Sequence, residues 1–323
     1  TRDNQWGIPA PFPGAEGKTI YVWFEAVIGY VTATIEWAVR RDSHELWKKY
    51  WLDPETKSVY FIGKDNIPFH TIILPALLMA YDDRFVLPWN VSSTEYLMFE
   101  GQKFSKSRGV GIWLDQALEY FPADYWRYYL VKIRPEKSDA NFSWEDFQKT
   151  INNDLNDNIG NFVHRVLTFI HNNFNGEIPA PQGFDELDNK LLSITKSAPL
   201  EAAKFMEELK MRQALETLTE LSSQGNVYLT RKEPWHTLKT EPSQARTTLY
   251  VATQVVKCLS ILLDPFIPES ALKMRDMLAI EIPDGDAWLS AGEQPLEPGH
   301  RIKRPRPLFE KIPDRRIAEL KNR

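Results

Sequence analysis

The residues best suited to chemistry in this 323-residue chain form a short basic loop. The loop holds the cations Lys103, Lys106 and Arg108 and the hydroxyls of Ser105 and Ser107. Ammonium groups on such a loop can bind a polyphosphate and stabilise the charge that develops on a leaving pyrophosphate during nucleotidyl transfer. A solvent-exposed basic loop without a ligand is the alternative interpretation, which the pattern alone leaves open.

A second group of chemically capable residues lies in the segment FIGKDNIPFH, residues 61–70. Gly63 has no side chain, so the backbone there could approach a nucleotide closely. The Asp65 carboxylate could accept hydrogen bonds from ribose hydroxyls, or it could cap the helix expected next. His70 falls in that helix, where a buried histidine with both ring nitrogens hydrogen-bonded is the alternative to a binding role.

Two further features are typical of contacts to single-stranded RNA. Asn161 and Arg165 are four residues apart, so on a helix they share one face, pointing away from the apolar residues of that helix. Trp235 follows Pro234, and an exposed indole can stack on a base. A solvated polar face and a tryptophan anchoring a loop are the alternative interpretations.

The elements that must position these residues differ between the two halves of the chain. In the first hundred residues, strands are expected at 19–24, 58–62 and from 85 to 87, and helices at 27–40 and 67–79. This alternation indicates βαβ units and a parallel sheet. Ligands bind beyond the carboxyl ends of such strands, which directs attention to residues 25–30 and 63–70.

The basic loop is expected to follow a short strand at 96–99 and a turn at 100–102, and helices are expected at 114–121 and 123–133. Beyond Ser143, a plausible N-cap, apolar residues recur every three or four positions along one long helix. Further helices are expected near 187–207, 209–231, 242–263 and 266–279, as in a helical bundle. A basic terminal helix is expected within residues 298–323.

The composition limits the class of protein. The net charge of −5 argues against a generic basic nucleic-acid coat, so any RNA contact must depend on local patches. The single cysteine, Cys258, excludes a disulfide within the chain and a cysteine-rich zinc site, and no metal site is expected. No run of 18 apolar residues indicates a membrane span, and a cytoplasmic location is expected.

The basic loop resembles the KMSKS signature of class I aminoacyl-tRNA synthetases, with Phe104 where Met is usual. Its surroundings, EGQKFSKSRGV, are similar to the archaeal and eukaryotic form of the methionyl-tRNA synthetase family. The resemblance implies that Lys106 is the principal phosphate-binding lysine, assisted by Lys103 and Ser105. The FIGKDN segment also matches this family, which implies that Gly63 and Asp65 contact the adenylate.

The same resemblance implies a methionine pocket and an active-site arginine. In YVWFEAVIGY it assigns Trp23, Ala26, Val27 and Tyr30 to the pocket, and in the segment after Gly63 it adds Asn66 and His70. Val27 stands where many bacterial relatives have proline. Aromatic rings suit the polarizable thioether of methionine. Arg2, in TRD, matches the arginine of the family's SRD segment, which lies at the active site.

For the second half, the resemblance implies an anticodon-binding domain that reads CAU. Asn161 and Arg165 match the family's anticodon-binding pair. Pro234 and Trp235 match its Pro-Trp motif, whose tryptophan stacks on the first anticodon base. Four segments are expected: half of a Rossmann catalytic domain at 1–94, the loop-bearing module at 95–146, the helical anticodon domain at 147–297, and a terminal helix at 298–323.

The resemblance implies a methionine–tRNA ligase that forms methionyl-adenylate from L-methionine and ATP with Mg²⁺, then transfers the methionyl group to elongator and initiator methionine tRNAs. The family's HIGH motif and zinc insertion are absent from this chain. The chain alone is therefore expected not to activate methionine, and zinc is expected only in the missing part. Alternatives are a non-catalytic anticodon-binding fragment and a nucleotidyltransferase of another pathway. Dimer or multisynthetase contacts are left undetermined.

Overall fold

The computed structural model describes residues 2–3, 6–281 and 287–321, with Arg2 and Asp3 described by their backbone only. The chain divides into two compact units. Unit 1 comprises residues 1–96 and 135–139, and unit 2 comprises residues 97–134 and 140–323. The residues predicted to bind methionine lie in unit 1, and those predicted to bind the anticodon lie in unit 2.

Unit 1 contains a βαβ arrangement. Its elements are β1 (Arg2–Asp3), β2 (Lys18–Thr19), α1 (Val22–Val39), α2 (Lys48–Trp51), β3 (Val59–Gly63), the 3₁₀ turn η1 (Lys64–Asn66), the π-helical turn η2 (Phe69–Ile73), α3 (Leu74–Tyr81) and β4 (Asn90–Thr94). β3 and β4 pair in parallel, from Val59 opposite Asn90 to Gly63 opposite Thr94. The predicted parallel sheet is thus confirmed, with η1, η2 and α3 forming the crossover.

Two of the predicted strands are wrong. Of the segment 19–24, only Thr19 lies in a strand, the two-residue β2, and α1 begins at Val22. A short apolar run does not distinguish a buried strand from a buried helix, and here it is the first turn of an 18-residue helix. Residues 85–87 lie in no strand, since Phe85 packs against Trp47 and Trp51 while β4 begins only at Asn90.

The predicted helix at 67–79 contains a local irregularity. The amide of Leu74 donates to the carbonyl of Phe69, five residues back, so η2 is π-helical before the chain continues as α3. Pro75 has no amide hydrogen for the carbonyl of Thr71, which removes one bond of a regular α-helical ladder at this point. Such π turns often occur at functional sites, and His70 lies within this one.

The core of unit 1 is small. It consists of Val27, Val31, Trp51, Tyr60, Leu74, Leu78 and Phe85. Other large apolar side chains of the unit are 44% to 82% exposed: Phe24, Phe61, Ile72, Met79 and Tyr81. By length and mean hydropathy (1.2), α1 is also apolar enough to cross a membrane, although core helices of soluble proteins pass the same test. Unit 1 therefore carries apolar surface that its own residues do not cover.

Unit 2 begins with a three-stranded sheet that holds the basic loop. Its strands are β5 (Leu97–Phe99), β6 (Gln102–Lys103) and β7 (Ala140–Phe142), in the order β6-β5-β7. The β5–β6 hairpin turns at Glu100 and Gly101, whose φ angles are 48° and 76°. Two consecutive left-handed residues are typical of a type I′ turn, whose twist matches that of the strands. α4 (Leu114–Tyr120) and α5 (Ala123–Lys132) confirm the two predicted helices.

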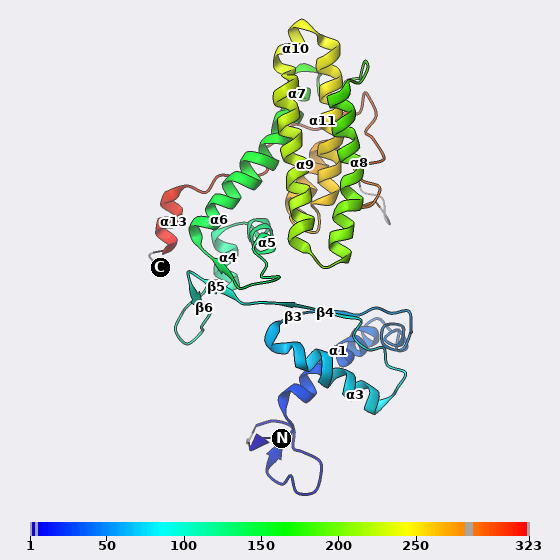
Figure 1. Ribbon diagram of the computed structural model, residues 1–323, viewed down its shortest axis with the longest axis vertical. Helices are drawn as coiled ribbons and strands as arrows, with labels where there is room; N and C mark the ends of the chain where they lie inside the picture. Colours follow the sequence, from blue (N-terminus) through cyan, green and yellow to red (C-terminus); the bar gives the residue numbers. More distant parts are fainter. Residues whose placement is uncertain (1, 4–5, 282–286, 322–323) are drawn as a thin grey trace. The chain divides into compact units, whose positions relative to one another are not determined.

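The remainder of unit 2 is the predicted helical bundle (Figure 1). One long helical run comprises α6 (Trp144–Thr150), the π-helical η3 (Ile151–Gly160) and α7 (Asn161–Asn173). It is followed by α8 (Glu186–Glu207), α9 (Met211–Lys232), α10 (Pro234–Thr240), α11 (Pro242–Leu262) and α12 (Pro268–Leu278). Ser143 caps α6, accepting a hydrogen bond from the Asp146 amide at 3.2 Å.

The predicted apolar face of the long helix forms the centre of the core. Phe147, Ile151, Leu155, Ile159, Phe162 and Val166 are 0% exposed. The C-terminal segment adds Leu308, Phe309 and Ile312 to this core without forming a helix or strand there, and only α13 (Asp314–Lys321) is helical. The terminal helix is thus much shorter than the expected range.

Candidate functional site

The basic loop is a tight extension of the β5–β6 hairpin. The amides and carbonyls of Ser105 and Val110 bond each other at 3.0 Å in both directions, which closes the loop at its base. Phe104 packs on Phe99 with ring centroids 5.6 Å apart. A Cβ at Gly111 would lie 2.5 Å from the Phe104 ring, so glycine permits this packing. The unusual Phe at position 104 therefore anchors the loop.

The loop presents its cations to solvent. Lys106 and Arg108 are exposed and form no ion pair with any described residue. The Lys106 ammonium lies 5.7 Å from the centroid of the Trp113 ring, beside a cavity of 390 Å³ lined by loop residues and Trp113. Since no carboxylate neutralises them, these cations remain available for an anionic ligand such as a polyphosphate.

In unit 1, residues from α1 and from the β3–α3 connection face each other as an aromatic cluster. Trp23 stacks on Phe69 with centroids 4.4 Å apart. Tyr30 lies edge-on to Tyr60, at 5.2 Å, and 5.6 Å from the ring of His70. Burial raises the pKa of the Tyr60 phenol, so it remains neutral. Trp23 and Tyr30 are seven residues apart and thus share one face of α1.

His70 is buried, with both ring nitrogens hydrogen-bonded. Nδ1 lies 2.9 Å from the carbonyl oxygen of Asn66, and Nε2 lies 2.9 Å from the Tyr30 hydroxyl. A carbonyl only accepts, so Nδ1 carries a hydrogen, and in the tautomer with the hydrogen on Nδ1 alone Nε2 accepts from the Tyr30 hydroxyl. These two contacts hold the ring in one orientation between α1 and the connection after β3.

The other predicted site residues of unit 1 differ in their exposure and in their contacts. Ala26 is exposed, whereas Val27 is 1% exposed and belongs to the core of the unit. Gly63 ends β3 with open space where a Cβ would be.

Asp65 does not cap a helix; its Oδ2 accepts a hydrogen bond from the Tyr96 hydroxyl at 2.6 Å. The Arg2 side chain lies outside the described residues, although its backbone pairs with Thr19 in β1.

The predicted RNA-binding residues of unit 2 meet at one end of the bundle. The Arg165 guanidinium, on α7, lies 5.0 Å from the centroid of the Trp235 ring, although the two residues are far apart in sequence. Arg165 is half-buried without a carboxylate partner among the described residues, and desolvation lowers its pKa. Asn161 is exposed on the same helix, one turn earlier. The Arg165 guanidinium, the Trp235 indole and the Asn161 amide thus lie at the same end of the bundle.

The structure corrects the expected loop at Pro234 and Trp235. Pro234 is the first residue of α10, and Trp235 lies in its first turn. Glu233 adopts a left-handed conformation with φ 43° and joins α9 directly to α10. Proline suits a first helical position because the missing amide hydrogen has no partner there. The dipeptide was thus a signal for a helix start that sequence reasoning missed.

Sequence reasoning also missed partners of the predicted residues. Tyr60 and Phe69 complete the aromatic cluster of unit 1, and the adjacency of Phe69 to His70 was the available signal. In unit 2, Tyr228 and Lys232 form a buried network with Asp188, just before the Pro234–Trp235 segment. No local pattern indicates this network, because its two sides are 40 residues apart.

Models of two protein families together match most of the chain. The model described as "tRNA synthetases class I (M)" matches residues 1–167. The model described as "Anticodon binding domain of methionyl tRNA ligase" matches residues 178–323. The first match contains the basic loop and the aromatic cluster, and the second contains Trp235.

Individual proteins are similar along nearly the whole chain. A methionine–tRNA ligase of Thermofilum pendens is 52% identical over 98% of this chain and 56% of its own length. That of Metallosphaera sedula is 46% identical over 97% of this chain and 55% of its own length. A solved structure of Mycobacterium tuberculosis methionyl-tRNA synthetase bound by methionyl-adenylate has a TM-score of 0.82 and 28% identity, covering 96% of this chain and 59% of that one. The chain thus spans just over half the length of these relatives.

Proposed function

The chain belongs to the methionyl-tRNA synthetase family, and we propose that it is the part of a methionine–tRNA ligase that contains the phosphate-binding loop and the anticodon-binding domain. The complete enzyme joins L-methionine and ATP into methionyl-adenylate, releases pyrophosphate, and transfers the methionyl group to the 3′ end of its tRNA. The observation that carries this proposal is the layout of unit 2. The β5–β6 hairpin lies at one end of the unit and α10 at the other (Figure 1), as a ligase requires if it is to act on one end of a tRNA and read another.

We propose that the aromatic cluster of unit 1 binds the methionine side chain. Trp23, Tyr30, Asn66 and His70 form its walls, with Ala26 and Val27 on the same stretch of α1. Aromatic edges favour a thioether over a purely aliphatic chain of similar volume. The hydrogen bond between Tyr30 and His70 holds the two rings in fixed positions, at 2.9 Å, and so fixes the shape of the pocket before methionine arrives.

Lys106 is proposed to be the main contact to the ATP phosphates, with Lys103 and Ser105 assisting and Arg2 as a further active-site cation. ATP enters with Mg²⁺ as the substrate. When the methionine carboxylate attacks the α-phosphorus, negative charge develops on the departing pyrophosphate, and fixed cations stabilise it. Gly63 is proposed to allow close approach of the adenosine, and Asp65 to accept hydrogen bonds from its ribose.

Asn161, Arg165, Pro234 and Trp235 are proposed to bind the CAU anticodon. The partly exposed Trp235 indole offers a stacking surface for the first anticodon base, and Arg165 supplies positive charge beside it. Elongator and initiator methionine tRNAs share this anticodon, so both are proposed partners. Recognition depends on these local groups, because the chain as a whole is acidic, with a net charge of −5.

The residues that the structure describes do not suit the zinc site expected for the family. Among the residues that the structure describes, no group of three His, Cys, Asp or Glu side chains could hold a metal ion. The one cysteine, Cys258, is buried in α11, and burial raises the pKa of its thiol to about 12, which disfavours the thiolate that zinc requires. We therefore propose that zinc binds outside this chain.

The exposed apolar surface of unit 1 supports the proposal that further chain completes the catalytic domain. We propose that residues 1–94 are half of that domain, 95–146 the loop-bearing module, 147–297 the anticodon domain and 298–323 its C-terminal extension. The apolar composition of α1 fits a helix covered by the rest of the sheet rather than by lipid. A cytoplasmic location is proposed on that basis.

Methionine-dependent exchange of pyrophosphate with ATP tests the proposed activity. The purified chain alone should show no exchange, since it lacks the HIGH motif that forms part of the ATP site in this family. The complete ligase assembled with this chain should exchange, and Lys106→Ala should slow it by about 10²–10³, as for loss of one preorganised donor to a developing charge. Lys190→Ala, which removes a solvent-exposed lysine on α8, is the matched control.

Exchange by the chain alone would show that its own residues suffice for activation and would overturn the proposed division of the ATP site. Equal rates for the Lys106→Ala and Lys190→Ala enzymes would remove the basic loop from the catalytic mechanism. If the assembled enzyme is inactive while the chain binds methionine tRNA, the function is reduced to anticodon binding.

A further inference from the structure

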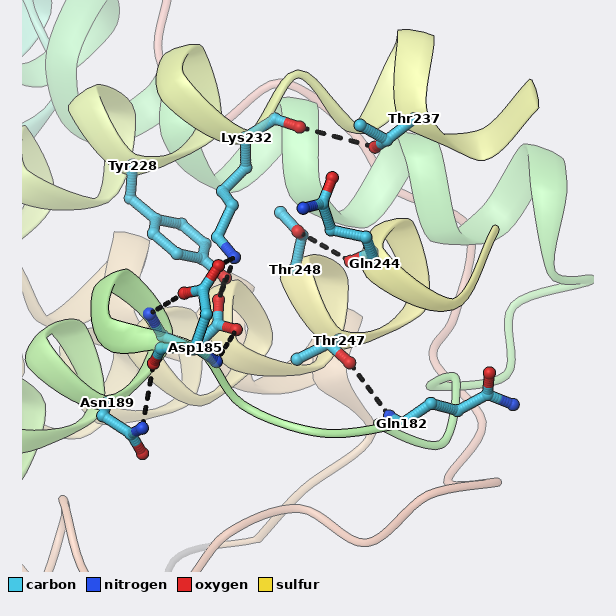
Figure 2. A network of polar contacts seen from close by, with 10 residues as sticks. Gln182, Asp185, Asn189, Tyr228, Lys232, Thr237, Gln244, Thr247 and Thr248 are labelled. Atoms are coloured by element: carbon cyan, nitrogen blue, oxygen red, sulfur yellow. Dashed lines mark hydrogen bonds and ion pairs between the residues drawn. The ribbon is translucent and has the colours of Figure 1, made fainter. Parts of the chain in front are cut away.

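A buried polar network joins the end of α9 to the start of α8, directly before the Pro234–Trp235 segment (Figure 2). The side chain of Lys232 is 3% exposed, and its Nζ lies 2.6 Å from Asp185 Oδ2 and 2.7 Å from Asp188 Oδ1. The Tyr228 hydroxyl donates a hydrogen bond to Asp188 Oδ1 at 2.6 Å. A buried ammonium, a buried carboxylate and a buried phenol thus meet beside a second carboxylate, that of Asp185, which is 51% exposed.

The backbone of both helices supports the charges in this network. Asp185 and Asp188 form a reciprocal capping box at the N-terminus of α8, with N–O distances of 3.0 Å and 2.9 Å. Lys232 is the last residue of α9. Carboxylates are favoured at a helix N-terminus and cations at a C-terminus, so each charge lies where its own helix stabilises it. The network therefore ties the two helix ends together in a defined register.

The chain passes from this network to Trp235 through two residues, Glu233 and Pro234. Glu233 follows Lys232 in a left-handed conformation, which a side chain such as glutamate rarely adopts unless its surroundings hold it. Pro234 is buried, and the Thr237 hydroxyl donates to the carbonyl of Glu233 at 3.2 Å. The direction of α10, and so the position of the Trp235 indole, depends on where α9 ends.

A polar network is an unusual way to fix a helix end if stability is the only requirement. A buried ion pair is often no more stabilising than apolar side chains of the same volume. The hydrogen bonds from Lys232 to Asp185 and from Tyr228 to Asp188 are directional, however, whereas apolar contacts allow side chains to slide. The network is thus better suited to setting geometry than to adding stability.

We propose that Lys232, Asp188 and Tyr228 are positioning residues for anticodon recognition. They fix the end of α9 and, through the left-handed residue Glu233, the direction in which α10 presents the Trp235 ring to a base. Arg165 contacts the same ring from α7, so the indole is oriented from two sides. This inference rests on the proposed anticodon-binding function.

A double-mutant cycle tests this coupling. The affinity of the purified chain for a synthetic RNA hairpin with a CAU anticodon loop is measured for the unaltered chain, Trp235→Ala, Lys232→Met and the double variant. Trp235→Ala should weaken binding by about 5- to 150-fold, the range for loss of one stacked base. Lys232→Met should weaken it by about tenfold, and the double variant should bind no more weakly than Trp235→Ala alone.

A control separates positioning from simple loss of charge. Arg231→Met removes the adjacent cation from the same helix end, where the side chain is exposed, and should change the affinity by about twofold or less. If Arg231→Met weakens binding as much as Lys232→Met, charge alone explains the effect and the proposal is overturned. The proposal is also overturned if the losses of RNA affinity caused by Trp235→Ala and by Lys232→Met multiply in the double variant, because the two residues would then act independently.

Tyr228→Phe provides a second variant in case Lys232→Met does not fold. It removes only the hydroxyl that donates to Asp188, and it should weaken binding a few-fold in the unaltered chain and not at all in the Trp235→Ala chain. If Trp235→Ala weakens binding and neither network variant does, the positioning role fails while the anticodon site stands. If Trp235→Ala itself has no effect, the proposed anticodon site fails, and the inference with it.

Discussion

Replacing Arg165 by methionine should weaken anticodon binding without weakening the fold. Methionine keeps an unbranched apolar chain of similar length but removes the guanidinium that lies 5.0 Å from the Trp235 ring. Arg165 is half-buried without a carboxylate partner among the described residues, and desolvation lowers its pKa. The unbound chain therefore bears the cost of a partly desolvated charge, which an anionic RNA would offset.

The expected magnitudes follow from these opposing contributions. Loss of the cation–π contact costs the fold about 0.5–1 kcal/mol at a site of this exposure. Relief of the desolvation acts in the opposite direction, so the free energy of unfolding should change by less than about 1 kcal/mol. RNA binding loses both the charge and part of the orientation of Trp235, and should weaken by about 1–3 kcal/mol.

The assay pairs urea denaturation with titration of a CAU anticodon hairpin. Arg246→Met is the matched control, because Arg246 also lies over an aromatic ring, 5.3 Å from the centroid of Phe174, but is exposed on α11. It should change RNA affinity far less than Arg165→Met does. A loss of more than about 2 kcal/mol of stability in Arg165→Met would refute the reasoning, since Arg165 would then be a structural residue. Unchanged RNA affinity would refute it equally.

Two further predictions concern the framework that holds the site. Gly225→Ala should lower the free energy of unfolding by about 1–3 kcal/mol, measured by urea denaturation, because the new Cβ would lie 2.5 Å from the buried Phe162 ring. The cost of this over-packing exceeds the gain of about 1 kcal/mol that alanine brings in helix propensity. Gly29→Ala, also in a helix but with open space around the new Cβ, should be neutral or stabilising, and equal losses for the two variants would contradict the over-packing argument. Hydrogen-exchange protection of residues 301–321 should fall in acid, because hydrogen bonds from Lys321, Lys311 and Lys303 lower the pKa values of Glu145, Asp157 and Asp276. A carboxylate whose pKa is lowered in the folded chain stabilises the fold at pH values above its unfolded-state pKa. This stabilisation disappears as the pH falls through the lowered, folded-state pKa, so the loss of protection should occur below about pH 4. Protection that is equal at pH 6 and pH 3 would show that the buried side chains of this segment hold it alone.

The sequence by itself determined the features that depend on short spacings. The basic loop at 103–109 was recognisable from its own residues. The helix through Phe147, Leu155 and Val166 followed from a period of three to four residues, because one face of a helix is buried whatever it packs against. That the sheet containing β3 is parallel followed from the alternation of elements, since two parallel strands need a crossover, but the partner strand β4 lies beyond the predicted segment 85–87.

Only the tertiary structure decided the features that depend on contacts between segments far apart in the sequence. The segment 19–24 enters α1 at Val22 instead of continuing as a strand, and Trp23 there stacks on Phe69 of the β3–α3 connection, a contact that no local pattern reveals. The contact of Arg165 with Trp235 and the burial of Lys232 against Asp188 join residues on different helices. The free energy of a charged side chain depends on how far it is desolvated and on which charges surround it, and both are set by the three-dimensional structure. The sequence could therefore name the residues of a site, but their pairing and orientation arise from the packing of one helix on another.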